Sequence, residues 1–251
     1  MADRSAESWY PTAAYLYVLH MDALGLAWEY LRRHPDYQLD WLRRRRRPEA
    51  AHDWGLRLLE DPSLDARDAH PAWFPDHEAV VQLYPDADPP PDAATFALWR
   101  LPGQKHLIHD GKRLVLVARW PGCCLRFALA PGLVDGMAYV YAIRACATPC
   151  ARCQALATEL DKLSTAVPAA TVRPRPTSAA LLELHTLQAL DATLAGASLR
   201  EVAEGVFGTD ATAADWHADS ALRARVRRLV RRGDALMRGG YRRLAQLPPP
   251  R

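Results

Sequence analysis

The chain has 251 residues, of which 49% are hydrophobic and 24% are charged, and its formal net charge is +3. This composition supports a globular protein with a hydrophobic core and argues against extensive disorder; the length suits one large domain or two to three small ones. No run of about 18 apolar residues occurs, so we expect no membrane span. A basic binding surface must come from the placement of the arginines, because the total charge is nearly balanced.

The amino-terminal residues lack a basic leader and a cleavage site, so we expect no signal peptide. The chain has five cysteines, two of them adjacent and three clustered. An odd, clustered set does not resemble a disulfide framework, and it indicates a reducing, cytoplasmic setting.

Residues 1–60 are predicted to form an N-terminal helical module. Apolar side chains recur at helical spacing before Pro35, and two further short helices are expected, one ending at Pro48 and one around Trp54 and Leu58. Glu29 is expected to pair with Arg32 or Arg33. Residues 61–95 are rich in proline and read as a linker, in which "AVVQLY" forms one short strand.

Residues 96–165 are predicted to form a small antiparallel β-meander followed by a helix. Short apolar runs near 96–100, 105–109, 113–119 and 124–129 are separated by Pro-Gly and Asp-Gly pairs. Asp110-Gly111 is a hairpin signal, because a tight turn needs a positive φ that glycine tolerates. A helix is expected over 151–165, and residues 166–177 form a second proline-rich linker.

Residues 178–247 are predicted to form a three-helix module of the helix-turn-helix type, which makes the fold class α+β. Ser198 and Glu201 have capping-box spacing, and Gly208 can supply the left-handed stop of the same helix. About ten residues then precede the third helix, whereas the usual turn has three or four. Trp216 is expected to anchor this longer connection in the core.

The third helix and the tail after it are rich in arginine. Arg223, Arg227 and Arg231 follow at a spacing of four, which predicts one basic row along the helix. Guanidinium groups can bind phosphates or guanine edges in the major groove. The residues assigned to DNA binding are Arg223, Arg225, Arg227, Arg228, Arg231, Arg232, Arg242, Arg243 and Ser220. The alternative is an ordinary solvated helix face.

Three segments carry a family resemblance. "LDATLAGASLREVAEGVFG", followed by a tryptophan and "LRARVRRLVRRGDALMRGGYRRL", resembles the C-terminal part of the domain of unknown function 2285. The central "FALWRLPGQKHLIHDGKRLVLVARW" resembles that domain's β portion. "YLYVLHMDALGLAWEYLRRHPDYQLDWLRR" resembles the short transcriptional-regulator-like domain that often precedes it.

The resemblance implies a proteobacterial regulator carried on an integrative and conjugative element. Two-domain members of this kind activate excision and transfer genes, notably the excisionase promoter, and single-domain members act as antiactivators. The expected partners are double-stranded promoter DNA, RNA polymerase and an antiactivator protein, with no membrane contact. The chain is therefore expected to be a cytoplasmic, nucleoid-associated activator. The alternative is a regulator whose basic helix docks on a protein partner.

A second basic run, Arg43 to Arg47, ends the second predicted helix of the N-terminal module. It is either another phosphate-contacting patch, formed by Arg43, Arg44, Arg45, Arg46 and Arg47, or a set of cations that complement the negative end of the helix dipole.

No catalytic or cofactor motif stands out. Cys146, Cys150 and Cys153 have partial zinc-ligand spacing, but a site would need a fourth ligand, so incidental thiols are favoured and no cofactor is expected. The sequence contains no phosphate-binding glycine loop and no H-E-x-x-H motif. We therefore expect a protein that is not an enzyme.

Overall fold

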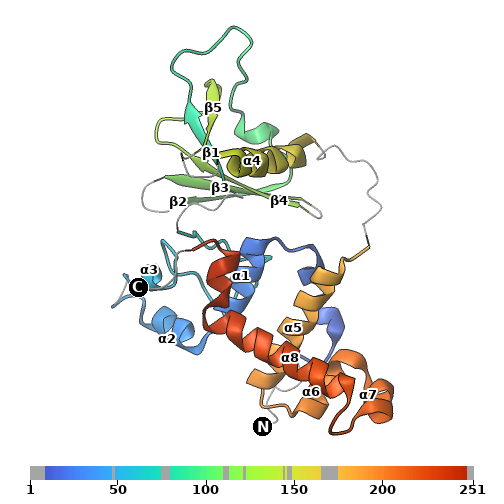
Figure 1. The fold of residues 1–251 in the computed structure, drawn as a ribbon. Helices are drawn as coiled ribbons and strands as arrows, with labels where there is room; N and C mark the ends of the chain where they lie inside the picture. The colour runs from blue at the N-terminus through green and yellow to red at the C-terminus, as the bar shows by residue number, and fades with distance from the viewer. Residues whose placement is uncertain are drawn as a thin grey trace. The chain divides into compact units, whose positions relative to one another are not determined.

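A computed structural model describes residues 9–46, 49–74, 80–109, 113–120, 123–143, 145, 149–164 and 175–247. The chain divides into two compact units. The helical unit joins Met1–Arg47, Asp61–Ala69 and Pro174–Arg251, and the sheet unit comprises Pro48–Glu60 and His70–Arg173. The fold class is α+β, as the sequence predicted (Figure 1).

Three elements form the N-terminal part of the helical unit. They are η1 (Thr12–His20, a 3₁₀ helix), α1 (Ala23–Leu31) and α2 (Pro35–Arg43). The Asp22 carboxylate caps α1 by accepting from the Gly25 N–H at 2.7 Å. Pro35 occupies the first turn of α2, where its missing N–H costs nothing. Most of α1 is buried, so this helix is part of the core of the unit.

The C-terminal part consists of six helical elements, α5 (Ser178–Leu194), α6 (Leu199–Phe207), α7 (Thr209–Asp215), α8 (Ala221–Ala235), η3 (Leu236–Gly240, a π turn) and α9 (Tyr241–Leu244). The capping box of Ser198 and Glu201 is present, and Gly208 ends α6 with a φ of 92°, both as predicted. The connection before α8 contains the helix α7, and the "GGYRRL" segment passes through η3 into α9, where Tyr241 is buried in the core.

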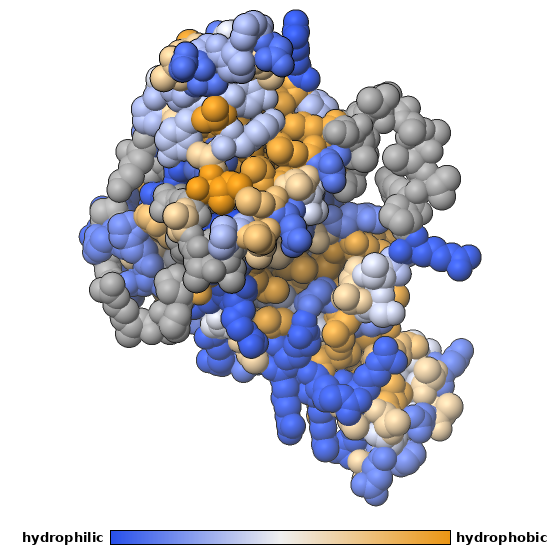
Figure 2. All heavy atoms as spheres, turned by 45° about the horizontal axis from the view of Figure 1, so that its top comes forward, coloured by the Kyte–Doolittle hydropathy of each residue, from blue (hydrophilic) through white to orange (hydrophobic). Residues whose placement is uncertain are grey.

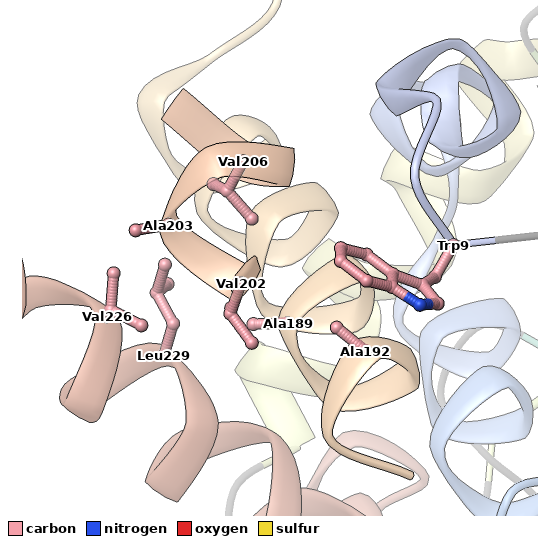
Figure 3. Close-up of a cluster of buried hydrophobic side chains, with 8 residues drawn as sticks. All are labelled: Trp9, Ala189, Ala192, Val202, Ala203, Val206, Val226 and Leu229. Carbon is pink, nitrogen blue, oxygen red and sulfur yellow. The ribbon is translucent and has the colours of Figure 1, made fainter. Parts of the chain in front are cut away.

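The core under α8 is shared by the two ends of the chain. Side chains from α5, α6 and α8 pack together with Trp9, as Figure 3 shows for Ala189, Ala192, Val202, Ala203, Val206, Val226 and Leu229. Trp216 packs against this cluster, as expected for an anchor of the α7–α8 connection. Gly205 leaves room for the indole of Trp9, since a Cβ there would lie 2.5 Å from its Cζ3 atom.

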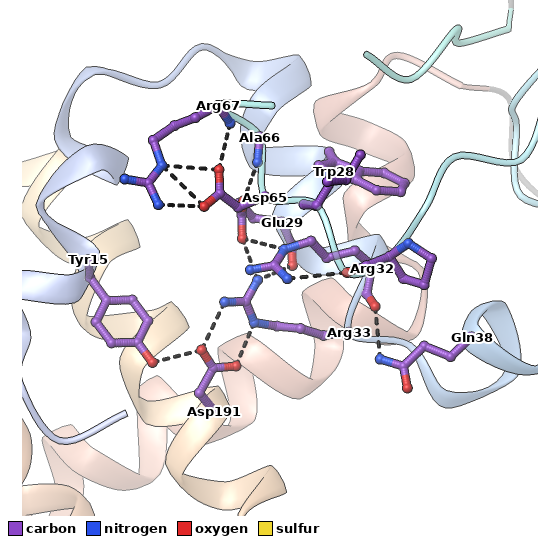
Figure 4. A network of polar contacts seen from close by, with 12 residues as sticks. Tyr15, Trp28, Glu29, Arg32, Arg33, Gln38, Asp65, Ala66, Arg67 and Asp191 are labelled. Atoms are coloured by element: carbon purple, nitrogen blue, oxygen red, sulfur yellow. Dashed lines mark hydrogen bonds and ion pairs between the residues drawn. The ribbon is translucent and has the colours of Figure 1, made fainter. Parts of the chain in front are cut away.

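A buried polar network also joins the two ends of the chain (Figure 4). The Glu29 carboxylate pairs with both Arg32 and Arg33, at 2.8 and 2.5 Å. Arg33 in turn pairs with Asp191 on α5 at 2.5 Å. The Glu29 carboxylate also accepts from the Ala66 N–H at 2.7 Å, so residues 61–69 belong to the same unit.

The sheet unit contains five strands in the order β2-β3-β4-β1-β5. Their bounds are β1 Val80–Pro85, β2 Gln104–His109, β3 Leu114–Trp120, β4 Cys123–Leu129 and β5 Tyr139–Ala142. The antiparallel meander β2-β3-β4 matches the prediction. The whole sheet is mixed, however, because β1 pairs in parallel with β4.

Two predicted elements of the sheet unit differ in the structure. The expected strand at 96–100 is replaced by a short 3₁₀ turn, η2 (Leu98–Arg100), because the Asp135 carboxylate holds the Leu98 N–H at 2.7 Å. The third N-terminal helix is only α3 (Ala50–Asp53), since Gly55 turns the backbone at a φ of 80°. The Asp110-Gly111 turn lies outside the described residues.

The last element of the sheet unit is α4 (Pro149–Ser164), close to the predicted helix at 151–165. Its leucines pack on the sheet core formed by buried side chains of β1, β3 and β4, including Leu83, Leu116 and Phe127. One face of the sheet is thereby covered by a helix.

Candidate nucleic-acid interface

The first turn of α8 is fixed by its cap. The Ser220 hydroxyl accepts from the Arg223 N–H at 3.0 Å, and only 3% of Ser220 is exposed. Its oxygen satisfies one of the orphan donors of the helix start. The structure therefore gives Ser220 a capping role, and its hydroxyl faces the helix rather than solvent.

One face of α8 is pressed against the core. Val226, Leu229 and Gly233 are buried along this face. Gly233 allows a close approach of α8 to α5, because a Cβ there would lie 3.0 Å from the Leu190 Cβ and 3.2 Å from the Thr186 carbonyl oxygen. With this face fixed, the opposite face of α8 is turned outward.

The outward face carries the exposed cations Arg227, Arg228 and Arg231. Within the described part of the chain, none of these three side chains takes part in a hydrogen bond or an ion pair. In Figure 2, long hydrophilic side chains project from the surface of the part that holds the C-terminal helices. We call the part of the α8 surface formed by Arg227, Arg228 and Arg231 the arginine face.

Other predicted arginines of α8 have partners inside the protein. The Arg225 guanidinium lies over the Phe207 ring at 4.6 Å, and this ring also lies 5.7 Å from that of His185. Arg232 forms an ion pair with Glu183 on α5, whose carboxylate also accepts from the Tyr30 hydroxyl at 2.6 Å. Arg232 thus joins α8 to α5 and α1.

Burial and charge shift the pKa values around these partners. Burial, together with the charge of Arg225, lowers the pKa of His185. Burial and the neighbouring Glu183 carboxylate raise the pKa of Tyr30 far above its ordinary value. Both side chains are therefore uncharged at neutral pH.

The remaining predicted arginines differ in exposure. Arg223 is half-buried, and its Nε has no hydrogen-bond partner among the described residues. Arg242 is half-buried beside Tyr241, whereas Arg243 is exposed. Arg238, which the sequence analysis did not assign, is exposed and pairs with Asp234 at 2.8 Å. The helical wheel distinguishes the exposed arginines of α8 from the buried positions. It does not reveal which arginines have partners on other helices.

The second basic run lies at the exposed end of α2. Arg43, Arg44, Arg45 and Arg46 are exposed, and Arg47 lies outside the described residues. The Arg44 guanidinium stacks 3.8 Å from the centre of the Trp41 ring and donates to the Trp41 carbonyl at 2.9 Å. Arg44 therefore closes the end of α2, while its neighbours extend into solvent.

The clustered cysteines do not form a metal site within the described residues. Cys150 and Cys153 are free and exposed at the start of α4, and Cys146 falls outside the described part. No group of three or more His, Cys, Asp and Glu side chains with metal-binding geometry occurs among the residues that the structure describes. None of the described helices combines the length and apolarity needed to cross a bilayer.

Three family models match the chain. Residues 8–58 match a proteobacterial transcriptional regulator-like domain, and residues 128–246 match a family described as "T6SS, transcription factor, DNA binding domain". Residues 78–125 match a domain of unknown function, DUF7011. No curated protein matches the chain. The first two matches support a DNA-binding transcriptional regulator as the class of this protein, and the DNA-binding match includes α8 and its arginine face.

Proposed function

We propose that the chain is a sequence-specific transcriptional activator that places α8 in the major groove of promoter DNA. α6 and α8 act as a helix-turn-helix pair, with α7 inserted in the turn. The targets are excision and conjugative-transfer genes of a bacterial mobile element, as the family resemblance implies. The protein works in the cytoplasm at the nucleoid and has no catalytic role.

The observation that carries this proposal is the arginine face. Arg227, Arg228 and Arg231 are exposed on the side of α8 opposite its buried face, and they have no partner among the described residues. A single α-helix fits the major groove, and arginine forks pair with phosphates and with guanine O6 and N7. The other arginines, paired with Phe207 and Glu183, hold α8 in place for this contact.

Arg243, Arg242 and the half-buried Arg223 flank the arginine face. Arg223 begins the same helical row one turn before Arg227, and Arg243 is exposed on α9, which follows α8. We assign backbone phosphates to them, since contacts near the ends of a recognition helix fix its register on the duplex. RNA polymerase and an antiactivator are the protein partners of this proposal.

The test is DNA binding by the full chain, measured by fluorescence anisotropy over a range of salt concentrations. Three duplexes are used. One is the region upstream of the neighbouring recombination genes, one is a region upstream of T6SS genes, and one is a scrambled control. Each phosphate contact contributes about −0.9 to the log–log salt slope. Arg227→Ala with Arg231→Ala is expected to weaken binding and to make the slope less steep by about 2.

Arg175→Ala is the matched control, because Arg175 is exposed before the start of α5, outside the proposed helix-turn-helix pair. It is expected to leave binding unchanged. Specific binding that survives the double substitution would show that the arginine face is not the DNA contact. Failure of the full chain to retain any duplex at low salt would reject the DNA-binding proposal in favour of a protein-docking regulator.

A further inference from the structure

The start of α2 lies beside the far end of the helix that bears the arginine face. His34 is the N-cap of α2, and its ring nitrogen accepts from the Asp36 N–H at 3.1 Å. Burial lowers the pKa of His34, and the charges that act on it are those of Asp36, Arg238 and Asp234. Two of these groups, Asp234 and Arg238, follow the arginine face along the chain, so the start of α2 lies within electrostatic range of the C-terminal end of α8.

Asp234, whose charge acts on His34, lies on the flank of α8 that carries the arginines. Arg227, Arg231 and Asp234 follow at spacings of four and three, which places them on one side of a helix. Asp234 then pairs with Arg238 one turn further on. A duplex that follows the Arg227–Arg231 row towards Arg238 therefore runs towards α2.

α2 is held rigidly in this position. Tyr37 is fully buried, and its ring packs edge-on against that of Trp28 in α1 at 5.6 Å. The nine residues of α2 span about 14 Å at 1.5 Å per residue. The helix is therefore about as long as a DNA groove is wide, so its basic end lies roughly one groove width from its start at His34.

The basic end of α2 contains more exposed charge than the helix dipole requires. Arg44 closes the helix through Trp41, as described above. Arg45 and Arg46 follow the last helical residue, are exposed, and form no side-chain hydrogen bond or ion pair within the described ranges. Neighbouring like charges of this kind repel one another, and a phosphate backbone neutralises them.

We propose that the basic end of α2, Arg43 together with Arg45 and Arg46, contacts the DNA backbone beside the segment that α8 reads. This inference rests on the proposed function and adds a second contact from the same compact unit. The contact is independent of base sequence, because it consists of exposed guanidinium groups and phosphates. The N-terminal segment thereby lengthens the footprint of the C-terminal helices.

The test compares two double variants that each remove two exposed cations from the helical unit. The first is Arg45→Gln with Arg46→Gln, and the matched control is Arg67→Gln with Arg175→Gln. Each is titrated with a duplex that ends at the minimal site and with one extended by about one helical turn on either side. On the extended duplex, the α2 variant is expected to weaken binding and to make the salt slope less steep by about 2.

On the minimal duplex, the α2 variant is expected to bind with the same affinity as the unsubstituted protein. On both duplexes, the α2 variant is expected to keep the preference of the unsubstituted protein for the specific over the scrambled sequence. An unchanged slope on the extended duplex, with binding still lost on substitution of Arg227 and Arg231, overturns this inference and leaves the proposed function intact. Absence of DNA binding by the unsubstituted chain rejects the proposed function itself.

Discussion

Arg33 and Asp191 form a two-pronged ion pair that joins the two ends of the chain. The Arg33 Nε donates to Oδ1 of Asp191 at 2.5 Å, and Nη2 donates to Oδ2 at 2.8 Å. The Tyr15 hydroxyl donates to the same carboxylate at 2.7 Å. Although burial alone would raise the pKa of Asp191, the Arg33 charge and these hydrogen bonds bring it below its ordinary value. The carboxylate is therefore charged at neutral pH, with every partner in place.

Asp191→Ala is expected to destabilise the helical unit by about 3 kcal/mol. Removing Asp191 takes away one of the two carboxylates that pair with Arg33, and it leaves this buried cation, whose side chain is only 8% exposed, with Glu29 alone. The free energy of unfolding is measured by urea denaturation at pH 7. Glu204→Ala breaks the more exposed pair with Arg200 and is the control, expected to cost less than about 1 kcal/mol. Equal costs for the two substitutions would contradict the structural role of the pair.

Gly205→Ala is expected to cost about 1–3 kcal/mol, since its new methyl group would overlap the Trp9 indole. The double variant with Trp9→Ala removes the overlapping ring, so the added cost of Gly205→Ala should nearly vanish in that background. Thermal denaturation of the four proteins of this cycle gives the coupling energy. Additive costs would show that Trp9 does not pack over Gly205 in solution.

Ser220→Ala separates capping from DNA contact. Loss of the Ser220 hydroxyl is expected to cost about 1 kcal/mol of stability, because the Arg223 N–H loses its acceptor. DNA affinity should stay within about twofold, because this buried hydroxyl faces the helix. Ser198→Ala, which opens the capping box of α6, is the matched control for stability. A large loss of DNA affinity in the Ser220→Ala variant, with unchanged stability, would show that Ser220 contacts DNA.

The sheet unit is expected to lose stability as the pH falls from about 6.5 to 4. Burial, aided by the charges of Arg119 and His106, lowers the pKa of His70 to about 4. Between this value and the ordinary one near 6.5, the unfolded chain binds the proton more readily than the folded chain does, so stability falls with pH across this window.

His70→Gln should flatten this dependence. The free energy of unfolding of both proteins is measured by urea denaturation at pH 7 and pH 5. Hydrogen exchange of the β3 amides at the two pH values then reports on the sheet unit itself. The decrease in stability from pH 7 to pH 5 should be smaller in the variant. A decrease of the same size in both proteins would assign the pH dependence to other groups.

Local signals in the sequence predicted the elements that they specify directly. The Ser198–Glu201 spacing and Gly208 predicted both ends of α6, and the apolar runs predicted β2, β3 and β4. These features depend on neighbours within a few residues, so one segment contains all the necessary information.

Features set by distant contacts were not predictable in the same way. The parallel pairing of β1 with β4 depends on which edge of the meander is free to accept another strand. The 3₁₀ conformation around Leu98 depends on the carboxylate of Asp135, which lies 37 residues further along the chain. The helical wheel correctly placed Arg227 and Arg231 on the outside of α8. It could not show that Arg232 is bound by Glu183, because that carboxylate belongs to α5.

The Arg33–Asp191 pair also has a consequence for synthesis on the ribosome. The two residues are separated by 158 positions, and the sheet unit lies almost wholly between them. At about 5–20 residues per second, Arg33 is made roughly 8–30 s before its partner. The sheet unit can therefore complete its own core while Arg33 still lacks Asp191 and has only Glu29 beside it, and the earliest-made segment reaches its final environment among the last.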